Sequence, residues 1–482
     1  MTLPVTLPVT LPAALVASWT AAPDRPVLWT TGTGWLTGAQ LEERSRQVAR
    51  RLAVAGVRAG DRVLLSGAPC ADLVVSYLAL LRLGSPVVPA NTAYTERELA
   101  HIVAEVRPVA ALLGEARALP GVPVVSPIDA SGLPPGTAAD GADAVLDRAG
   151  PEDPALIGFT SGTTGAPKGA VLSQRNLHAG AAAVVEAWRW TPDDRLACAL
   201  PLFHMHGLGV ALGGTLLSGA SIVVLPRFTV DGVLDAISEH RASLFFGVPT
   251  MYSRLAGSAR LGELAALRLA VSGSAPLPAT LWSALQDGSG QRVLERYGMT
   301  ETVMLTSNPY DGERRPGTVG LPLPGVSLRL APDSGVVEVR GPSVFSAYWQ
   351  RPADTKGAFT GDGWFRTGDI GAVSEDGYLT LVGRASELII SGGFNIYPRE
   401  VEDVLRGHPA IGDVAVIGLP DPEWGEIVTA YCVGDPVSEE ELMAYCGPLL
   451  ASFKRPRRWR WVEALPRNAM GKVVRDQVRE LG

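Results

Sequence analysis

Residues 160–169 read Thr160-Ser161-Gly162-Thr163-Thr164-Gly165-Ala166-Pro167-Lys168-Gly169. Glycine adopts positive φ angles without steric cost, so successive backbone N–H groups in such a loop can converge on an anion. The hydroxyl groups add hydrogen-bond donors, and the lysine adds a positive charge. The composition predicts a loop that wraps the phosphates of a nucleotide; a flexible surface turn is the alternative. A P-loop is excluded, because that motif has Ser or Thr directly after its lysine and here Gly169 follows.

The sequence around this loop alternates between short apolar strands and amphipathic helices. The patterns predict helices over 39–54, 73–83 and 95–106, and strands over 61–66, 86–89 and 155–159. Such alternation is typical of parallel sheets with flanking helices, so we expect an α/β fold. The strand over 155–159 leads into the loop, and Ser173 can cap a helix that follows it. A strand–loop–helix arrangement is where an open α/β sheet binds its ligands.

Three later strands are predicted to meet at one cleft. They cover 242–247, 268–271 and 293–297, and each ends in a loop of small polar residues or glycine. The segment 114–150 is rich in Pro, Gly, Ala and Asp and is predicted to form loops. From about residue 317 the strands become shorter and the turns more frequent.

The last hundred residues are predicted to form a small separate α+β domain. The patterns predict helices over 398–407 and 438–450, and strands over 413–418, 427–433 and 458–463. The chain of 482 residues is also too long for a single hydrophobic core. We therefore expect an N-terminal domain over 1–383 and a C-terminal domain over 384–482.

Composition excludes several classes of partner. The net charge is −7 and there is no long basic run, which argues against nucleic acid. No apolar run of about 18 residues is present, so no transmembrane helix is expected. The N-terminus repeats Thr-Leu-Pro-Val without a basic region, which argues against a signal peptide and for a poorly ordered start. The four scattered cysteines indicate neither a zinc site nor a disulfide framework, and a cytoplasmic location is expected.

Five further motifs follow the loop in order. They are Tyr297-Gly298-Met299-Thr300-Glu301, Thr367-Gly368-Asp369, Gly383-Arg384, Ser391-Gly392-Gly393-Phe394-Asn395 and Pro466-Arg467-Asn468-Ala469-Met470-Gly471-Lys472. Over roughly residues 25–480 the chain resembles the acyl-adenylate-forming enzymes, a superfamily of acyl-CoA synthetases, peptide-synthetase adenylation domains and luciferases. The resemblance implies a large N-terminal domain and a small mobile C-terminal one. It also implies ATP, Mg²⁺ and CoA: a carboxylate attacks the α-phosphate of ATP, pyrophosphate leaves, and the CoA thiol then displaces AMP.

The resemblance implies a role for residues of each motif. Tyr297 offers a face to adenine, Asp369 accepts from the ribose hydroxyls, and Arg384 reaches ribose or phosphate. Thr300 donates to the α-phosphate, and Glu301 binds Mg²⁺ as a hard oxygen ligand. The implied nucleotide and phosphate contacts also include Thr160, Ser161, Gly162, Thr163, Thr164, Lys168, Ser274, Ala275, Glu295 and Gly298. Taken individually, Asp369 fits a turn aspartate and Glu301 a solvated acid.

The C-terminal motifs are expected to act in turn. Lys472 resembles the lysine that stabilises negative charge during adenylation, although a Gly-Lys pair near a C-terminus also fits a surface turn. Ser391, Gly392, Gly393 and Phe394 resemble the side that receives CoA. One domain cannot easily present both to one site, so a rotation about a hinge near 383–387 is expected. The family often has Lys-Asp where this chain has Ser386-Glu387, so no residue role is assigned at the hinge.

Two arginines point to the class of acid. Arg296 directly precedes Tyr297, where ligases for fatty or aryl acids usually carry a small or uncharged residue, and Arg254 lies earlier in the chain. Guanidinium binds carboxylate with two parallel hydrogen bonds, so these arginines predict a second carboxylate on the substrate. A monocarboxylate would leave the arginine unpaired. A local salt bridge from Arg296 to Glu295 or Asp311 is the alternative.

Other residues complete the predicted acid pocket. His204 and His206 lie where the family shapes it, Met205 and Met304 are candidates for its floor, and Ser272 begins the loop after the predicted strand over 268–271. Core hydrogen bonding for the histidines and plain packing for the methionines remain alternatives. The segments 294–325 and 394–400 look like malonyl-CoA synthetases. The sequence thus predicts an ATP-dependent malonate–CoA ligase that also accepts methylmalonate. A medium-chain or aryl acyl-CoA ligase, a stand-alone enzyme that loads a carrier protein, and a non-catalytic nucleotide-binding protein stay open, as does the oligomeric state.

Overall fold

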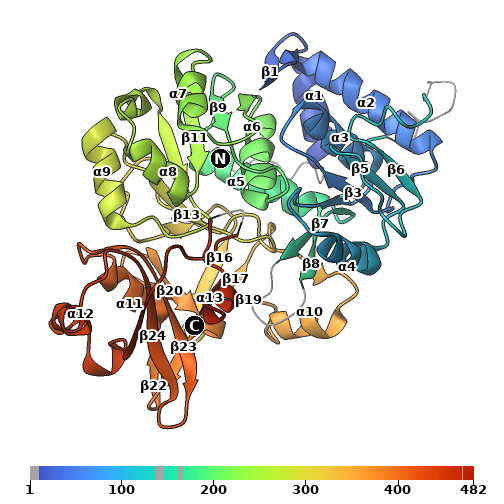
Figure 1. Cartoon of the computed structure of the whole chain (residues 1–482). Coiled ribbons are helices and arrows are strands. Elements are labelled where there is room, and N and C mark those ends of the chain that lie inside the picture. The colour runs from blue at the N-terminus through green and yellow to red at the C-terminus, as the bar shows by residue number, and fades with distance from the viewer. Residues whose placement is uncertain (1–9, 136–145, 161–166, 469–470, 482) are drawn as a thin grey trace.

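Two large sheets and a set of covering helices form the N-terminal part of the molecule (Figure 1). The computed structural model describes residues 10–135, 146–160, 167–468 and 471–481. The nine-stranded sheet has the order β15 (Leu321–Pro322), β14 (Thr306–Ser307), β13 (Leu294–Tyr297), β12 (Leu269–Ser272), β11 (Leu244–Gly247), β9 (Arg195–Cys198), β10 (Ser221–Val224), β1 (Pro26–Thr30) and β2 (Gly34–Thr37). From β13 to β1 neighbouring strands are parallel, as the alternating pattern predicted.

The second large sheet contains the two strands that flank the predicted phosphate loop in the sequence. Its order is β18 (Ala347–Tyr348), β8 (Lys168–Ser173), β7 (Pro154–Thr160), β4 (Val87–Pro89), β3 (Val63–Ser66), β5 (Ala110–Leu113) and β6 (Val124–Pro127). Strands β7 and β8 are antiparallel, with Thr160 opposite Lys168. The prediction of a strand, a loop and then a helix is therefore wrong in one respect, because β8 lies between the loop and the helix. The prediction that 114–150 forms loops throughout is wrong at β6, whose Val-Val pair extends the sheet.

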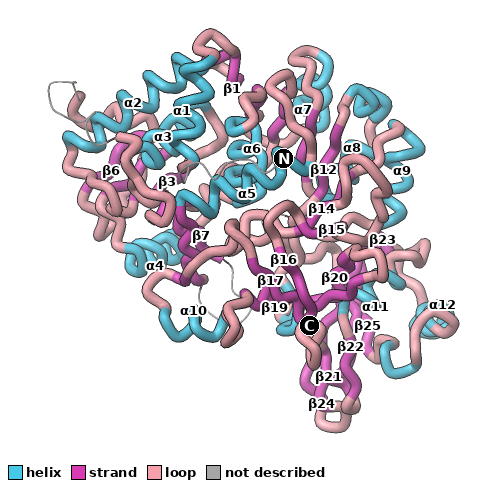
Figure 2. The backbone as a smooth tube through the Cα atoms, turned by 180° about the vertical axis from the view of Figure 1, so that it is seen from behind, coloured by secondary structure: helices cyan, strands magenta, loops and turns pink. Residues whose placement is uncertain are grey.

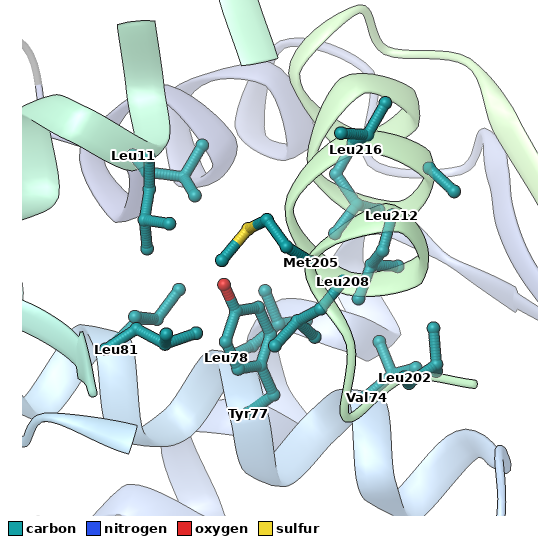
Figure 3. Packing of buried hydrophobic residues seen from close by; sticks show 14 of the residues in the cluster. Leu11, Val74, Tyr77, Leu78, Leu81, Leu202, Met205, Leu208, Leu212 and Leu216 are labelled. Atoms are coloured by element: carbon teal, nitrogen blue, oxygen red, sulfur yellow. The ribbon is translucent and has the colours of Figure 1, made fainter. Parts of the chain in front are cut away.

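Helices cover both sheets. They are α1 (Leu11–Ala21), α2 (Gly38–Val54), α3 (Ala71–Leu83), α4 (Glu96–Val106), α5 (Gln174–Ala187), α6 (Gly213–Leu217), α7 (Val230–Ser238), α8 (Pro249–Ala256), α9 (Ala279–Ser289) and α10 (Pro352–Ala358), with η3 (His206–Leu212) and η4 (Leu261–Ala266) between them. The predicted cap of α5 is confirmed: the Ser173 hydroxyl accepts from the Asn176 backbone N–H at 3.2 Å, and the Asn176 side chain accepts from the Ser173 N–H at 2.9 Å. The largest core packs α1, α3 and the η3–α6 segment together (Figure 3).

Two smaller sheets complete the chain. A four-stranded antiparallel sheet contains β16 (Ser327–Leu330), β17 (Val336–Arg340), β19 (Phe365–Val373) and β20 (Leu379–Arg384). The last sheet contains β21 (Ile389–Ser391), β22 (Phe394–Ile396), β23 (Ile411–Asp421), β24 (Gly425–Gly434) and β25 (Arg458–Trp461), with α11 (Pro398–Leu405), α12 (Glu439–Cys446), η6 (Ser452–Lys454) and α13 (Arg475–Arg479). The four-stranded sheet lies between the large sheets and this last one (Figure 2).

The predicted hinge segment coincides with a change of sheet. Strand β20 ends at Arg384, the short turn η5 (Ala385–Glu387) follows, and β21 opens the last sheet. That sheet has its own core with α11 and α12, built around Val401, Leu405 and Leu442. The boundary at 383/384 and the rotation about it stay predictions. None of the described helices is long and apolar enough to cross a membrane. The expected poorly ordered start falls on residues 1–9, outside the described residues.

Candidate active site

A cavity of about 660 Å³ opens where the strand ends of the nine-stranded sheet face the C-terminal segment. Strands β11, β12 and β13 are parallel neighbours, so their carboxyl ends share one edge, as predicted for the shared cleft. The cavity is lined by nine of the residues that the sequence assigned to the site: Ser274, Ala275, Glu295, Arg296, Tyr297, Gly298, Asp369, Arg384 and Lys472. Residues from three parts of the chain thus meet at one place.

Tyr297, Asp369 and Arg384 form a connected group on one wall. The Tyr297 hydroxyl donates to Oδ2 of Asp369 at 2.5 Å, and Nε of Arg384 lies 2.9 Å from Oδ1 of the same carboxylate. Asp369 and Arg384 face each other across β19 and β20, which places the two side chains as a cross-strand pair. Burial and the Asp369 charge raise the pKa of Tyr297, so its phenol stays a donor. The group offers an aromatic face beside a fixed carboxylate, which suits a nucleoside.

Glu301 is buried at 4% exposure with one carboxylate oxygen engaged. The Tyr348 hydroxyl donates to Oε1 at 3.0 Å, and within the described residues Oε2 has no hydrogen-bond partner. Burial raises the pKa of Glu301. A buried carboxylate oxygen without a donor fits a hard divalent cation, and Mg²⁺ in phosphate sites is bound by one or two carboxylates plus the phosphates. Glu301 therefore fits the predicted Mg²⁺ ligand.

Thr300 and Lys168 have contacts with other parts of the N-terminal region. The Thr300 methyl packs over Gly158 of β7, where an added Cβ would lie 2.5 Å from Cγ2. The Lys168 ammonium lies 2.5 Å from Oδ1 of Asp354 and 5.5 Å from the ring centroid of Tyr348. Thr160 and Lys168 close the ends of β7 and β8. Ser161, Gly162, Thr163 and Thr164 lie outside the described residues, so their predicted phosphate contacts stay predictions.

A second group of polar atoms surrounds Arg296. Arg296 is 6% exposed, and among the described residues neither Nε nor Nη2 has a hydrogen-bond partner. The same holds, within those ranges, for His204 Nδ1 and His206 Nε2, the two histidines on which the Arg296 charge acts. Ser272 Oγ is also without a partner in those ranges, but Ser272 pairs in register with Glu295 and therefore lies on the face of the sheet opposite Arg296. On its other ring nitrogen, Nδ1, His206 lies 3.3 Å from the Ser274 hydroxyl. Buried polar atoms are nearly always paired, and an unpaired buried charge costs several kcal/mol, so this arrangement calls for an anion.

Burial determines the protonation states of Arg296 and the two histidines beside it. Burial lowers the pKa of Arg296 to about 9, which is still above neutral pH, so the guanidinium keeps its charge. Burial, followed by the Arg296 charge, lowers the pKa of His204 to about 4 and that of His206 well below its ordinary value. Both histidines are neutral at pH 7. The group therefore carries one positive charge and several neutral hydrogen-bonding atoms, a combination suited to one carboxylate.

The local salt bridge considered for Arg296 is absent from the described contacts. The Glu295 carboxylate accepts instead from the backbone N–H groups of Leu277 at 3.1 Å and Gly317 at 3.0 Å. Burial raises the pKa of Glu295 to about 7. Asp311 pairs with Arg189. Glu295 thus braces two loops beside the cavity, and its nucleotide contact stays a prediction.

Two residues predicted for the acid pocket, Arg254 and Met205, lie elsewhere, and a third, Met304, is buried beneath the lining of the cavity. Arg254 is exposed on α8, with its guanidinium 5.2 Å from the ring centroid of Phe228, and does not join Arg296. Met205 points into the core beside Tyr77 and Leu208 (Figure 3). Met304 is fully buried against the backbone of Gly298. Met205 therefore follows the alternative of plain packing, because its thioether fills core space. The Met304 sulfur lies against Gly298, which lines the cavity, so the place of Met304 beneath the cavity floor stays a prediction.

Lys472 reaches the cavity from the C-terminal segment. Its backbone N–H donates to Oδ1 of Asn468 at 3.0 Å, and the neighbouring Gly471, at φ +73°, lies against Thr250 of α8. Burial and the Arg384 charge lower the pKa of Lys472. Arg475, three residues later, binds Oε2 of Glu387 in η5 at 3.0 Å. Gly471 thus lies close to the N-terminal part, and Arg475 connects α13, the helix after the lysine, to the hinge turn.

The predicted CoA-side residues are remote from the cavity in this arrangement. Ser391, Gly392, Gly393 and Phe394 form the tip of the β21–β22 hairpin, at the far end of the last sheet (Figures 1 and 2). Phe394 is 52% exposed and stacks on Phe453 at 4.5 Å between ring centroids. The cavity therefore meets Lys472 and not the hairpin.

Comparison with known proteins places the chain in a family. The model of the AMP-binding enzyme family matches residues 15–349, and that of the AMP-binding enzyme C-terminal domain matches 400–472. The chain is 35% identical to a malonate–CoA ligase of Arabidopsis thaliana, over 87% of this chain and 78% of that protein. It is 33% identical to the long-chain-fatty-acid–CoA ligase FadD13 of Mycobacterium tuberculosis, over 92% and 93%.

Among solved structures, the chain is similar to ATP-bound MatB from Rhodopseudomonas palustris. The TM-score is 0.89 at 38% identity, covering 98% of this chain and 99% of that one. The two family matches, one over the large N-terminal part and one over the last sheet, agree with the order of motifs in the sequence. The chain belongs to the AMP-binding enzyme family, the superfamily of acyl-adenylate-forming enzymes.

Proposed function

We propose that the chain is an AMP-forming malonate–CoA ligase that uses ATP. The observation that carries the proposal is the buried guanidinium of Arg296, whose Nε and Nη2 lack partners among the described residues. One carboxylate of malonate would pair with Arg296, and the other would face the nucleotide across the same cavity. Methylmalonate presents the same two carboxylates at the same spacing, so we include it as a substrate. The chain is similarly identical in sequence to a malonate ligase and to a fatty-acid ligase, so sequence identity does not distinguish the two substrates. The Arg296 side chain does.

In the first half-reaction, the free carboxylate oxygen attacks the α-phosphorus of ATP. The bond from that phosphorus to the bridging oxygen of the β-phosphate breaks, and pyrophosphate leaves with the electron pair. Tyr297 and Asp369 would hold the nucleoside, and Thr300 would donate to the α-phosphate. Glu301 would hold Mg²⁺, which supplies charge neutralisation for the phosphates when bound. Lys472 would stabilise the negative charge that accumulates on the reacting oxygens.

In the second half-reaction, the thiolate of CoA attacks the acyl carbon and AMP leaves. Lys472 occupies the cavity in this structure, while the 391–394 hairpin lies away from it. We therefore propose that the C-terminal domain, residues 384–482, rotates about 383–387 so that the hairpin replaces the lysine. The Arg475–Glu387 contact would carry the lysine loop along with the hinge turn.

A panel of acids tests the proposal. With ATP, Mg²⁺ and CoA, malonate is expected to release pyrophosphate at least a hundredfold more efficiently, in kcat/KM, than hexanoate or benzoate. The reason is that a monocarboxylate leaves the Arg296 charge unpaired. Faster turnover of hexanoate or benzoate would contradict the dicarboxylate assignment. Replacing CoA with an acyl carrier protein bearing a pantetheine arm separates a CoA ligase from a carrier-loading enzyme.

Removing the partner of Lys168 is expected to tighten ATP binding. Asp354 holds the ammonium at 2.5 Å on a partly exposed pair, so it competes with the ATP phosphates for that charge. Exposed ion pairs contribute about 0.2–1 kcal/mol, so Asp354→Asn is expected to lower the Kd for a non-hydrolysable ATP analogue up to about fivefold. Calorimetric titration without acid measures this. Asp231→Asn, exposed on α7, is the control, and weaker binding by Asp354→Asn would show that Asp354 instead positions the lysine.

A further inference from the structure

The Arg296 guanidinium rests directly on a glycine. Gly273 follows β12, and because Ser272 pairs with Glu295 in register, Gly273 lies beside Arg296 of the neighbouring strand. A Cβ added to Gly273 would lie 2.3 Å from Cζ, 2.4 Å from Nε and 2.7 Å from Nη2 of Arg296. All three nearest atoms belong to one guanidinium. A side chain at residue 273 and the present position of Arg296 therefore exclude each other.

The backbone of Gly273 does not itself require glycine. Its φ lies outside the left-handed range, unlike that of the neighbouring Ser274, at φ +70°. The Gly273 N–H donates to the carbonyl of Gly247 on β11 at 3.3 Å, which fixes the main chain to the sheet. With the main chain fixed, relief of a clash has to come from the far end of the Arg296 side chain. Glycine at residue 273 thus leaves room for the Arg296 guanidinium, and it is not needed for the conformation of the backbone.

The glycine faces the arginine rather than the nucleotide side of the cavity. The cavity lining includes Ser274 and Ala275 from this loop, and Gly273 is not part of it. Ser272, which pairs with Glu295 in register, lies on the opposite face of the sheet from Arg296. Gly273 therefore contacts Arg296 and not the nucleotide side of the cavity.

We propose that Gly273 is a specificity-determining position, because its absent side chain forms the seat that holds Arg296 in place for a dicarboxylic acid. The inference rests on the proposed function, in which Arg296 binds the distal carboxylate. A side chain at residue 273 would push the guanidinium off its seat. The enzyme would then lose its advantage for the dianion while its adenylation machinery remains.

Gly273→Ala tests the seat. The variant is expected to lower kcat/KM for malonate about 10–100-fold, to leave the KM for ATP within twofold, and to reduce the preference for malonate over butyrate by a similar factor. Gly262→Ala is the matched control, since an added Cβ there meets nothing within 4 Å and its φ is outside the left-handed range. Gly262→Ala is expected to match the parent. A parallel rise in the KM for ATP would overturn the proposal, because the glycine would then serve the nucleotide.

A double-mutant cycle identifies the partner. In an Arg296→Ala background, Gly273→Ala is expected to change kcat/KM for malonate by less than twofold, because the clashing group is gone. If Gly273→Ala alone fails to fold, recovery of folding in the double variant gives the same identification through the melting temperature. If Gly273→Ala lowers kcat/KM for malonate as strongly in the Arg296→Ala background as it does alone, the proposed contact between Gly273 and Arg296 is wrong. If Arg296→Ala lowers the selectivity for malonate and Gly273→Ala does not, the proposal for Gly273 is wrong and the proposed function stands. If Arg296→Ala leaves selectivity unchanged, the proposed function falls with it.

Discussion

Lys472→Ala is expected to slow formation of the acyl-adenylate about 10²–10³-fold, while a preformed adenylate still reacts with CoA within about twofold of the parent rate. A preorganised charge aimed at developing negative charge contributes on this scale in other enzymes. Here Lys472 lines a cavity that is also lined by Tyr297 and Arg384. Its neighbour Gly471 lies close to Thr250 of α8. The loss is confined to one half-reaction because the lysine is needed only while the α-phosphate is attacked.

The two half-reactions are measured separately. Malonate-dependent exchange of pyrophosphate into ATP reports adenylation, and release of AMP from synthetic malonyl-adenylate and CoA reports transfer. Lys356→Ala, an exposed lysine on α10, is the control. Equal losses in both assays would indicate a structural role for Lys472, and no loss in exchange would remove the proposed role.

The surroundings of Lys472 also predict the direction in which the rate of adenylation changes with pH. Burial and the Arg384 charge lower its pKa, so it loses its proton at a lower pH than an exposed lysine does. Adenylation by the parent enzyme is therefore expected to fall on the alkaline side as this group deprotonates. Lys472→Ala should lack the part of this fall that comes from Lys472, because no charge is left to lose at residue 472. The part that comes from Arg296, whose pKa burial lowers to about 9, should remain in both proteins.

The sequence predicted the edge at which the site forms. The predicted strands over 242–247, 268–271 and 293–297 each lead into a loop of glycine or small polar residues, and neighbouring parallel strands end on one edge of a sheet. Strand β8 was missed because it starts with Lys168-Gly169, a pair that favours a turn when read locally. It is stabilised by pairing with β7 and β18, which only the fold supplies.

The sequence pattern does not show which of the two arginines is buried. Residues 295 and 296 point to opposite faces of β13, so one carboxylate braces backbone amides while the next side chain enters the polar group. Arg254, in the last turn of the short helix α8, points to solvent over Phe228. A single sequence does not show which face of so short a helix meets the cavity. The burial of Arg296, and with it the choice between the two arginines, came from the packing.

Arg296→Ala is expected to lower kcat/KM for malonate roughly 10²–10³-fold, and to lower it far less for butyrate. Truncating one partner of a buried hydrogen-bonded charge pair costs about 2–5 kcal/mol, and here the partner is the distal carboxylate, which a monocarboxylate does not have. The ligand-free variant is expected to unfold at no lower temperature than the parent, because an uncompensated buried cation has been removed. Stabilisation of the folded protein by malonate, in contrast, should largely disappear.

The comparison with Arg254→Ala makes the test specific to position rather than to net charge. Both variants remove one arginine, but Arg254 is exposed and separated from the polar group, so its loss is expected to change malonate kinetics less than twofold. Steady-state assays with malonate and butyrate, together with thermal melts with and without malonate, measure all of these effects. If Arg296→Ala weakened both acids equally, the guanidinium would be acting on the shared carboxylate or on the fold, and the second carboxylate would need another partner. If both variants instead acted alike on malonate, the effect would come from long-range charge. If a single buried guanidinium binds the distal carboxylate, kcat/KM for malonate should fall in Arg296→Ala and not in Arg254→Ala, and it should fall more than kcat/KM for butyrate does.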